Sequence, residues 1–201
     1  MSELAHAATD IIAGWPARSA RRSFWEQRPP RDRASLERLL VQLRYLHERM
    51  VDGLSTALDR IRPDEARYSL SLVLVRHART LLERDRAMTE FLPLAGIEAL
   101  ANQLFILATN DWPVFLALIE PLYRVVFPMD ALRHVLADGA AGPVEPTDLS
   151  FINAATSLDE LYACLASMEP AAPAASDRVR AQTFLLLEMA DLVYEDLAGQ
   201  A

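Results

Sequence analysis

The chain has 201 residues, a formal net charge of −8, 52% hydrophobic residues and only six glycines. This length suits one domain with a substantial core, and the scarcity of glycine favours helices over a turn-rich β architecture. No uninterrupted apolar run approaches the roughly 18 residues of a membrane helix, so we expect no membrane span. The acidic balance argues against general nucleic-acid binding, which depends on neutralising many phosphates.

The sequence predicts a cytoplasmic protein. Its first residues lack the basic stretch and apolar core of a signal peptide. Cys164 is the single cysteine and has no internal disulfide partner, which suits a reducing compartment. The chain has 20 arginines and no lysine, a bias that indicates a bacterial source with a GC-rich genome.

Residues 1–33 form the first predicted unit, an amphipathic helix over 3–14 followed by an extended connector over 15–33. The connector carries Phe24 and Trp25 among six arginines: Arg18, Arg21, Arg22, Arg28, Arg31 and Arg33. Such a cluster indicates either a solvated connector or a site for an anion or a partner.

Two long amphipathic helices are predicted next. The first begins at a Ser35 cap, and His47 lies on or beside its apolar stripe. That stripe has helical spacing and consists of Leu36, Leu39, Leu40, Leu43, Leu46, Met50, Leu54 and Leu58. Pro63 opens the second helix, whose stripe includes His77 and which ends near Pro93.

The rest of the chain predicts shorter helices. One spans about 97–109 and another about 112–126, with a turn at Asn110-Asp111 between them and a bend or break at Pro121. The later elements are a short helix over 129–137, a Gly-, Pro- and Ala-rich loop over 138–146, a helix from about 147 to 168, a flexible connector, and a last helix from a Ser176 cap to about Leu197.

Together these elements predict an all-α, single-domain bundle of about seven helices. The single domain covers 1–201, with 34–198 as the bundle. The sequence contains no Gly-rich phosphate loop, no Cys/His zinc spacing, no His-Glu-x-x-His and no nucleophile elbow. The four histidines are far apart, so a metal site would need ligands from several helices.

The order of the helices follows a recognisable plan. Its markers are the Phe91-Leu-Pro-Leu-Ala-Gly96 segment, Glu120 within a helix pair, the segment from Phe151 to Tyr162, and a final helix carrying Glu188 and Tyr194. This plan resembles the heme-oxygenase-like superfamily, which includes heme oxygenases, thiaminase II-like proteins, the pyrroloquinoline-quinone synthase group and diiron oxidases. The resemblance covers about residues 20–198 and rests on helix order, without an intact motif.

The metal-ligand motifs of the diiron oxidases are mostly replaced in this chain. Those proteins carry Glu-x6-His on the second long helix, Glu on a middle helix and His-x3-Asp-x2-His on the penultimate one. The corresponding positions here are His77, Arg84, Glu120, Ala155, Asp159 and Tyr162, with a first-helix ligand near Leu43 or His47. An arginine at a ligand position repels a cation, so a standard diiron centre is not expected.

Two interpretations of the remaining inward residues stay open. The resemblance implies that a single iron or manganese ion would be held by His47, His77, Glu120 and Asp159, since two histidines with carboxylates suit such a metal. Otherwise these groups form a buried polar network in which Arg84 neutralises a carboxylate, and no cofactor is needed. In either case we expect one ligand-binding cavity lined by His77, Arg84, Glu120, Asp159 and Tyr162.

The sequence supports three functional hypotheses. The first is a heme-oxygenase-like protein with a degenerate metal site that binds a small, partly apolar ligand or acts as a divergent oxidase. The alternative is a non-catalytic protein–protein interaction module (an adaptor, chaperone or immunity-type protein) with Trp15, Phe24 and Trp25 exposed at its surface. A transcription regulator fits worst, because no basic helix-turn-helix precedes the bundle. Homodimerisation is compatible with all three.

Overall fold

Five helices make up most of the described structure, which is a computed structural model. The described residues are 11–12, 15, 20–27, 29–30, 32–60, 92–126, 132, 134–135 and 176–199. The helices are α2 (Ala20–Gln27), α3 (Arg33–Leu58), α5 (Ala95–Asn110), α6 (Trp112–Val126) and α10 (Ser176–Gly199). These residues contain no strand, which confirms the all-α class. Among them, no helix is both long and apolar enough to cross a membrane.

The N-cap of helix α3 is Asp32, three residues before the predicted cap at Ser35. The Asp32 carboxylate accepts a hydrogen bond from the Ser35 backbone N–H at 2.8 Å, and the Asp32 N–H donates to the Ser35 hydroxyl at 3.3 Å. This reciprocal pair is a capping box, so Ser35 contributes from inside the helix. The hydrogen bonds from Ser35 also lower the pKa of Asp32.

The prediction of an extended connector over 15–33 is wrong, because Ala20–Gln27 form helix α2. An eight-residue helix is unstable alone, so its packing determines its structure. Phe24 is buried, with its ring centroid 5.7 Å from that of Tyr194 on α10, and Trp25 packs edge-on against Phe24 at 5.2 Å. Phe24 therefore joins α2 to α10 and is not an exposed surface aromatic.

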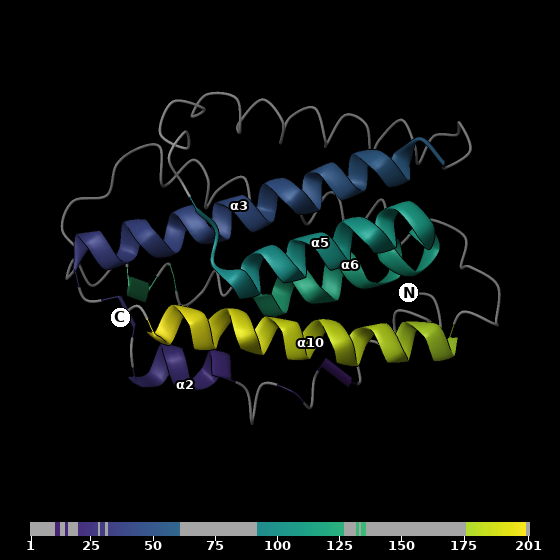
Figure 1. The fold of residues 1–201 in the computed structure, drawn as a ribbon. Coiled ribbons are helices and arrows are strands. Elements are labelled where there is room, and N and C mark those ends of the chain that lie inside the picture. The colour runs from purple at the N-terminus through teal and green to yellow at the C-terminus, as the bar shows by residue number, and fades with distance from the viewer. Residues whose placement is uncertain are drawn as a thin grey trace.

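Helix α5 lies at the centre of the arrangement and contacts α3, α6 and α10 (Figure 1). It runs parallel to α3, since Leu94 bonds to Gln42 near one end while Ala108 approaches Gly53 near the other. It runs antiparallel to α10, because Gly96 bonds to Asp196 at one end and Gln103 to Gln182 further along. Helix α2 packs on α10.

The turn between α5 and α6 is confirmed at Asp111. The Asp111 N–H donates to the Leu107 carbonyl at 2.8 Å, and the Asp111 carbonyl accepts from Phe115 N–H at 3.0 Å. Arg178 on α10 forms a 2.8 Å ion pair with the Asp111 carboxylate, which ties the turn to α10. Helix α6 continues through Pro121, so the predicted break does not occur.

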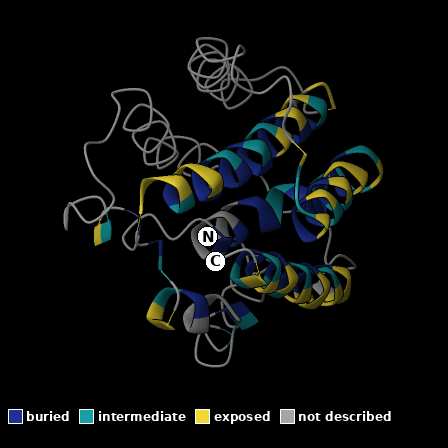
Figure 2. Ribbon diagram, turned by 60° about the vertical axis from the view of Figure 1, so that its left-hand side comes forward, coloured by how far each residue is buried: buried dark blue, intermediate teal, exposed yellow. Residues whose placement is uncertain are grey.

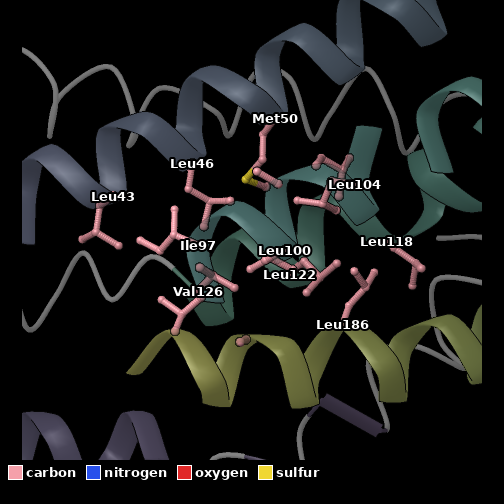
Figure 3. Packing of buried hydrophobic residues seen from close by; sticks show 14 of the residues in the cluster. Leu43, Leu46, Met50, Ile97, Leu100, Leu104, Leu118, Leu122, Val126 and Leu186 are labelled. Atoms are coloured by element: carbon pink, nitrogen blue, oxygen red, sulfur yellow. The ribbon is translucent and has the colours of Figure 1, made fainter. Parts of the chain in front are cut away.

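The core is a single, mainly aliphatic cluster to which all five helices contribute, most of it from α3, α5, α6 and α10 (Figure 3). The predicted stripe of α3 is confirmed at every position whose burial is described: Leu36, Leu39, Leu40, Leu43, Leu46, Met50 and Leu54. Figure 2 shows the buried inner and exposed outer faces of the helices. Truncating one such leucine to alanine typically costs about 2–5 kcal/mol, so this cluster dominates stability.

Several predicted elements lie outside the described residues. These are the second long helix opening at Pro63, the loop over 138–146 and the helix from about 147 to 168. Of the short helix over 129–137, Leu132, His134 and Val135 are described and are helical. The expected total of about seven helices stays a prediction beside the five described.

Candidate functional site

Only two of the predicted site residues lie on described helices. His47 belongs to α3, and Glu120 belongs to α6, where its backbone is helical and its side chain is outside the description. The other predicted ligand-binding residues also lie outside it: His77, Arg84, Asp159 and Tyr162. The convergence of these groups on one cavity therefore stays a prediction.

His47 is 1% exposed and lies within the buried face of α3. Its position on the apolar stripe is thereby confirmed. Helical spacing places Leu43 one turn before it and Val51 one turn after it, and both are buried. Among the described residues, no group of three or more His, Cys, Asp or Glu side chains is placed to hold a metal ion.

Two other polar residues are buried on α3, and both have structural partners. Gln42 accepts a hydrogen bond from Leu94 N–H at 3.0 Å and donates to the Leu92 carbonyl at 3.5 Å. Gln42 thus fixes the entry into α5. Arg44 donates to the Glu48 carboxylate at 3.1 Å, one helical turn away.

Glu48 is half-buried, and its burial raises the pKa of its carboxyl group. The hydrogen bond and the positive charge of Arg44 act in the opposite direction but are smaller. A carboxyl group with this balance takes up a proton more readily than one in water. Raised pKa values occur in both functional sites and structural ion pairs. Because Glu48 is paired with Arg44 on the same helix, we interpret it as part of a structural ion pair.

Two late residues of α10 have opposite environments. Tyr194 is completely buried, and its hydroxyl donates to the Val126 carbonyl at 2.6 Å. Glu188 is exposed, so its carboxylate faces solvent and is not part of a site inside the bundle. His134 is also exposed.

An exposed apolar surface on α5 and α10 was not predicted from the sequence. We use the name outer face for the exposed large apolar side chains of these two helices, which are Phe105 (47% exposed), Ile106 (50%), Phe184 (59%), Leu185 (41%) and Leu192 (51%). The signal was present in two apolar runs, 104–107 and 184–187, because four consecutive large apolar residues in a helix cannot all face one core. A helical projection of each run would have identified the outward positions.

The outer face spans two helices that are packed closely together. The Gln103 amide donates to Gln182 at 3.1 Å across the contact between α5 and α10. Gly96 permits a close approach, since an added Cβ would lie 2.9 Å from the Val193 nitrogen. The residues of the outer face therefore belong to two closely packed helices.

No protein-family model, curated protein or solved structure matches this chain.

Proposed function

We propose that the chain is a helical protein–protein interaction module whose partner packs against the outer face of α5 and α10. The observation that carries this proposal is the exposure of five large apolar side chains on two adjoining helices. Isolated exposed apolar residues are ordinary, but several on one helix pair are typical of a binding surface. Such a module would act in the cytoplasm without catalysis.

The chemistry around the outer face also suits a protein partner. Phenylalanine and large aliphatic side chains form the apolar part, and the same two helices carry exposed charged residues of both signs, including Glu98, Arg180 and Glu188. Protein interfaces commonly combine an apolar centre with a polar rim. Because α5 and α10 are fixed against each other by Gly96 and the Gln103–Gln182 bond, little ordering would be needed on binding.

Site-specific photo-crosslinking in cells tests this proposal. A photoreactive amino acid is placed at Ile106 or Leu185 on the outer face, and at Arg38 or Ser55, which are exposed on α3, as matched controls. We expect discrete higher-mass adducts from the two outer-face positions and none from the controls. Equal adduct yields at all four positions would contradict an interaction through this surface.

A second proposal is the heme-oxygenase-like bundle of about seven helices with a degenerate metal site. His47 favours it, because this titratable side chain is buried in the core on α3, and α3 contacts the helix that carries Glu120. In this arrangement His47, His77, Glu120 and Asp159 would hold iron or manganese, and a small, partly apolar substrate would bind beside Arg84 and Tyr162.

Metal content tests the second proposal. The full chain is loaded anaerobically with ferrous iron or manganese and compared with a Glu120→Ala, Asp159→Ala double variant. Stoichiometric metal that is lost in the variant would support a remnant oxidase site. Equal metal content in the two proteins, including none in either, would contradict it and leave the interaction module.

A further inference from the structure

We infer that the partner of the module is a basic, amphipathic helix of another protein, which packs its apolar side on the part of α10 that borders α5. The inference rests on the proposed function, because it names the chemistry of the partner for the same pair of helices. It is carried by a row of apolar side chains on α10 and by the acidic charge beside that row.

Three apolar side chains form a row along one side of α10. Leu185, Met189 and Leu192 are spaced four and three residues apart, so they lie on the same side of the helix. Leu185 is 41% exposed and Leu192 is 51% exposed, and Met189 is partly buried. We call these three residues the apolar row. It is about 10 Å long, because an α-helix rises by about that distance over two turns.

Two hydrogen bonds show that the apolar row borders α5 (Figure 1). Gln182, three residues before the row, accepts from the Gln103 amide of α5 at 3.1 Å. Asp196, four residues after the row, accepts from the Gly96 N–H of α5 at 2.7 Å. Helical spacing places Gln182 and Asp196 on the same side of α10 as the apolar row.

Helix α2 packs on a different side of α10. Phe24 lies near Tyr194, and Trp15 donates to the Asp191 carboxylate at 3.0 Å. At about 100° per residue, Asp191 and Tyr194 each project at least about 100° around the helix from every member of the apolar row. The contacts of Phe24 and Trp15 therefore do not occupy the side of α10 that the partner would use.

The charge of the helices beside the apolar row is acidic. Helix α5 and residues 181–199 of α10 together contain five acidic residues and no basic one. Three of the five are exposed, namely Glu98, Glu188 and Glu195. Helix α3 differs, because it contains four arginines and three acidic residues. The acidic charge is thus a property of this surface and not only of the whole chain.

The exposed acidic residues come from both helices and lie close to the apolar row. The bond between Gly96 and Asp196 brings the start of α5 to the end of α10, so Glu98 and Glu195 belong to the same end of the pair. Glu188 lies within the span of the row, one turn from its first and last members. Arginine or lysine beside the apolar residues of a partner would form ion pairs here, whereas an acidic partner or an anionic membrane surface would be repelled.

A helix is the partner structure that suits the apolar row. An amphipathic helix presents apolar residues at i, i+3 or i+4 and i+7, which is the spacing of the row itself. Two such helices can interdigitate over about two turns, with the charged positions of the partner beside the glutamates. The contact is smaller than the roughly 1,600 Å² of a standard interface, so weak binding is expected.

Peptide selection with the full chain tests the chemistry of the partner. Random peptides of about 16 residues, which is enough for four helical turns, are displayed on phage and selected for binding. We expect the selected peptides to carry a net positive charge and apolar residues at helical spacing. The dissociation constant of each synthetic peptide is then measured by fluorescence anisotropy.

Two double variants of the chain test where the selected peptides bind. Leu185→Ser with Leu192→Ser removes the exposed apolar side chains, and the dissociation constant should rise by about tenfold or more. Glu188→Arg with Glu195→Arg reverses the charge and should have an effect of similar size. For the wild type, the dissociation constant should also rise with salt concentration, because the ion pairs are at the surface.

A matched control separates a local effect from a change in overall charge. Glu37→Arg with Asp52→Arg makes the same charge change at exposed positions of α3 and should alter the dissociation constant by less than about twofold. Circular dichroism should be the same for all variants, since the substituted residues are exposed. Selected peptides that are neutral or acidic, or a selection without peptides that depend on the apolar row, would overturn the inference.

The crosslinking experiment distinguishes failure of the inference from failure of the proposed function. Adducts at Leu185 with a different protein, beside a failed peptide selection, would overturn the basic helical partner and support the interaction module. Adducts with twice the mass of the chain would show a second copy on this surface and would also overturn it. No adduct above the Arg38 and Ser55 controls would overturn both.

Discussion

Tyr194 connects three helices through one side chain. Its ring packs near Phe24 of α2, and its hydroxyl donates to the Val126 carbonyl at the end of α6. The residue itself is completely buried on α10. A hydroxyl in such a place needs an acceptor, because an unpaired polar group inside the core is costly.

Replacing Tyr194 by phenylalanine should therefore destabilise the protein without changing its fold. The ring remains, but the buried Val126 carbonyl loses its donor from α10, which typically costs about 1–3 kcal/mol. The free energy of unfolding is measured in urea. Thr109→Val is the matched control, because it removes an exposed hydroxyl that bonds within its own helix, and its effect should stay within about 0.5 kcal/mol. Equal losses in both variants would contradict this role.

Glu48 gives a prediction with a definite sign. Its pKa is raised in the folded protein, mainly by burial, so the folded state binds the proton more tightly than the unfolded chain does. The resulting stabilisation is fully present below the usual value of 4.5 and is lost as pH rises through the folded-state pKa. At neutral pH the charged carboxylate thus costs stability.

The Glu48→Gln variant removes this titration. The free energy of unfolding of the wild type should rise relative to the variant as pH falls from 7 toward 4 (about the usual carboxyl range). Glutamine also weakens the contact with Arg44, which changes the free energy of unfolding by an amount that does not vary with pH. The pH dependence of the difference between the two proteins, and not its size, therefore reports the titration of Glu48. A difference that is flat with pH, or that slopes the other way, would show that Arg44 outweighs burial.

Residue burial could be predicted only in part from the sequence. The apolar stripe of α3 and the burial of His47 follow from helical spacing alone. Phe24 could not be placed that way, because its burial depends on α10, which lies about 150 residues further along the chain. Asp32 was missed for a local reason, since Asp and Ser both favour the cap and only the backbone geometry distinguishes them.

At the scale of elements, the contact between α5 and α10 depends on Gly96. An added Cβ there would lie 2.9 Å from the Val193 nitrogen and 3.0 Å from the Leu192 carbonyl carbon, both backbone atoms that cannot rotate away. The Gly96 N–H also donates to the Asp196 carboxylate at 2.7 Å. The two helices must therefore separate if this residue gains a side chain.

Gly96→Ala should lower the free energy of unfolding by about 1–3 kcal/mol through overpacking. Gly199→Ala is the control, because nothing lies within 4 Å of the Cβ it would add. That substitution should be close to neutral. Urea denaturation of both variants provides the measurement, and a Gly96→Ala protein as stable as the wild type would mean that α10 can shift away at little cost.

Helix boundaries were predicted well where apolar spacing and turn residues agree. Trp112–Val126 matches the predicted helix over about 112–126, and Ala95–Asn110 extends the one over 97–109 by a few residues. Helix α2 was missed because its Arg-rich sequence and the nearby prolines resemble a connector. Tertiary packing of Phe24 outweighs that local signal.

At the scale of the molecule, we expect the described helices to unfold together. One hydrophobic cluster includes residues of all five, and Trp15, Trp25 and Trp112 pack against it. Tryptophan fluorescence and far-ultraviolet circular dichroism should therefore give the same urea midpoint, as in a two-state transition. A fluorescence midpoint at lower urea would instead mean that the segment with Trp15 and Trp25 detaches first.

The candidate site shows where prediction from one sequence stops. His47, His77, Glu120 and Asp159 belong to separate segments, and only their positions in a helix order bring them together. Spacing within a helix fixes which side a residue faces, but the rotation and depth of neighbouring helices depend on packing that periodicity does not encode. The exposed apolar residues of the outer face were in principle easier to predict from the sequence, since each apolar run lies within one helix.

The docking of α2 on α10 also has a consequence for synthesis of the chain. Trp15 donates to the Asp191 carboxylate at 3.0 Å, and Phe24 needs Tyr194 as a neighbour. Neither partner exists until the ribosome has translated at least 170 further residues, which takes on the order of 10 s at typical rates. During that interval the aromatic side chains of α2 have no native surface to cover them. The nascent chain would then be a natural client for a chaperone that holds exposed N-terminal aromatics, and completion of α10 would release it.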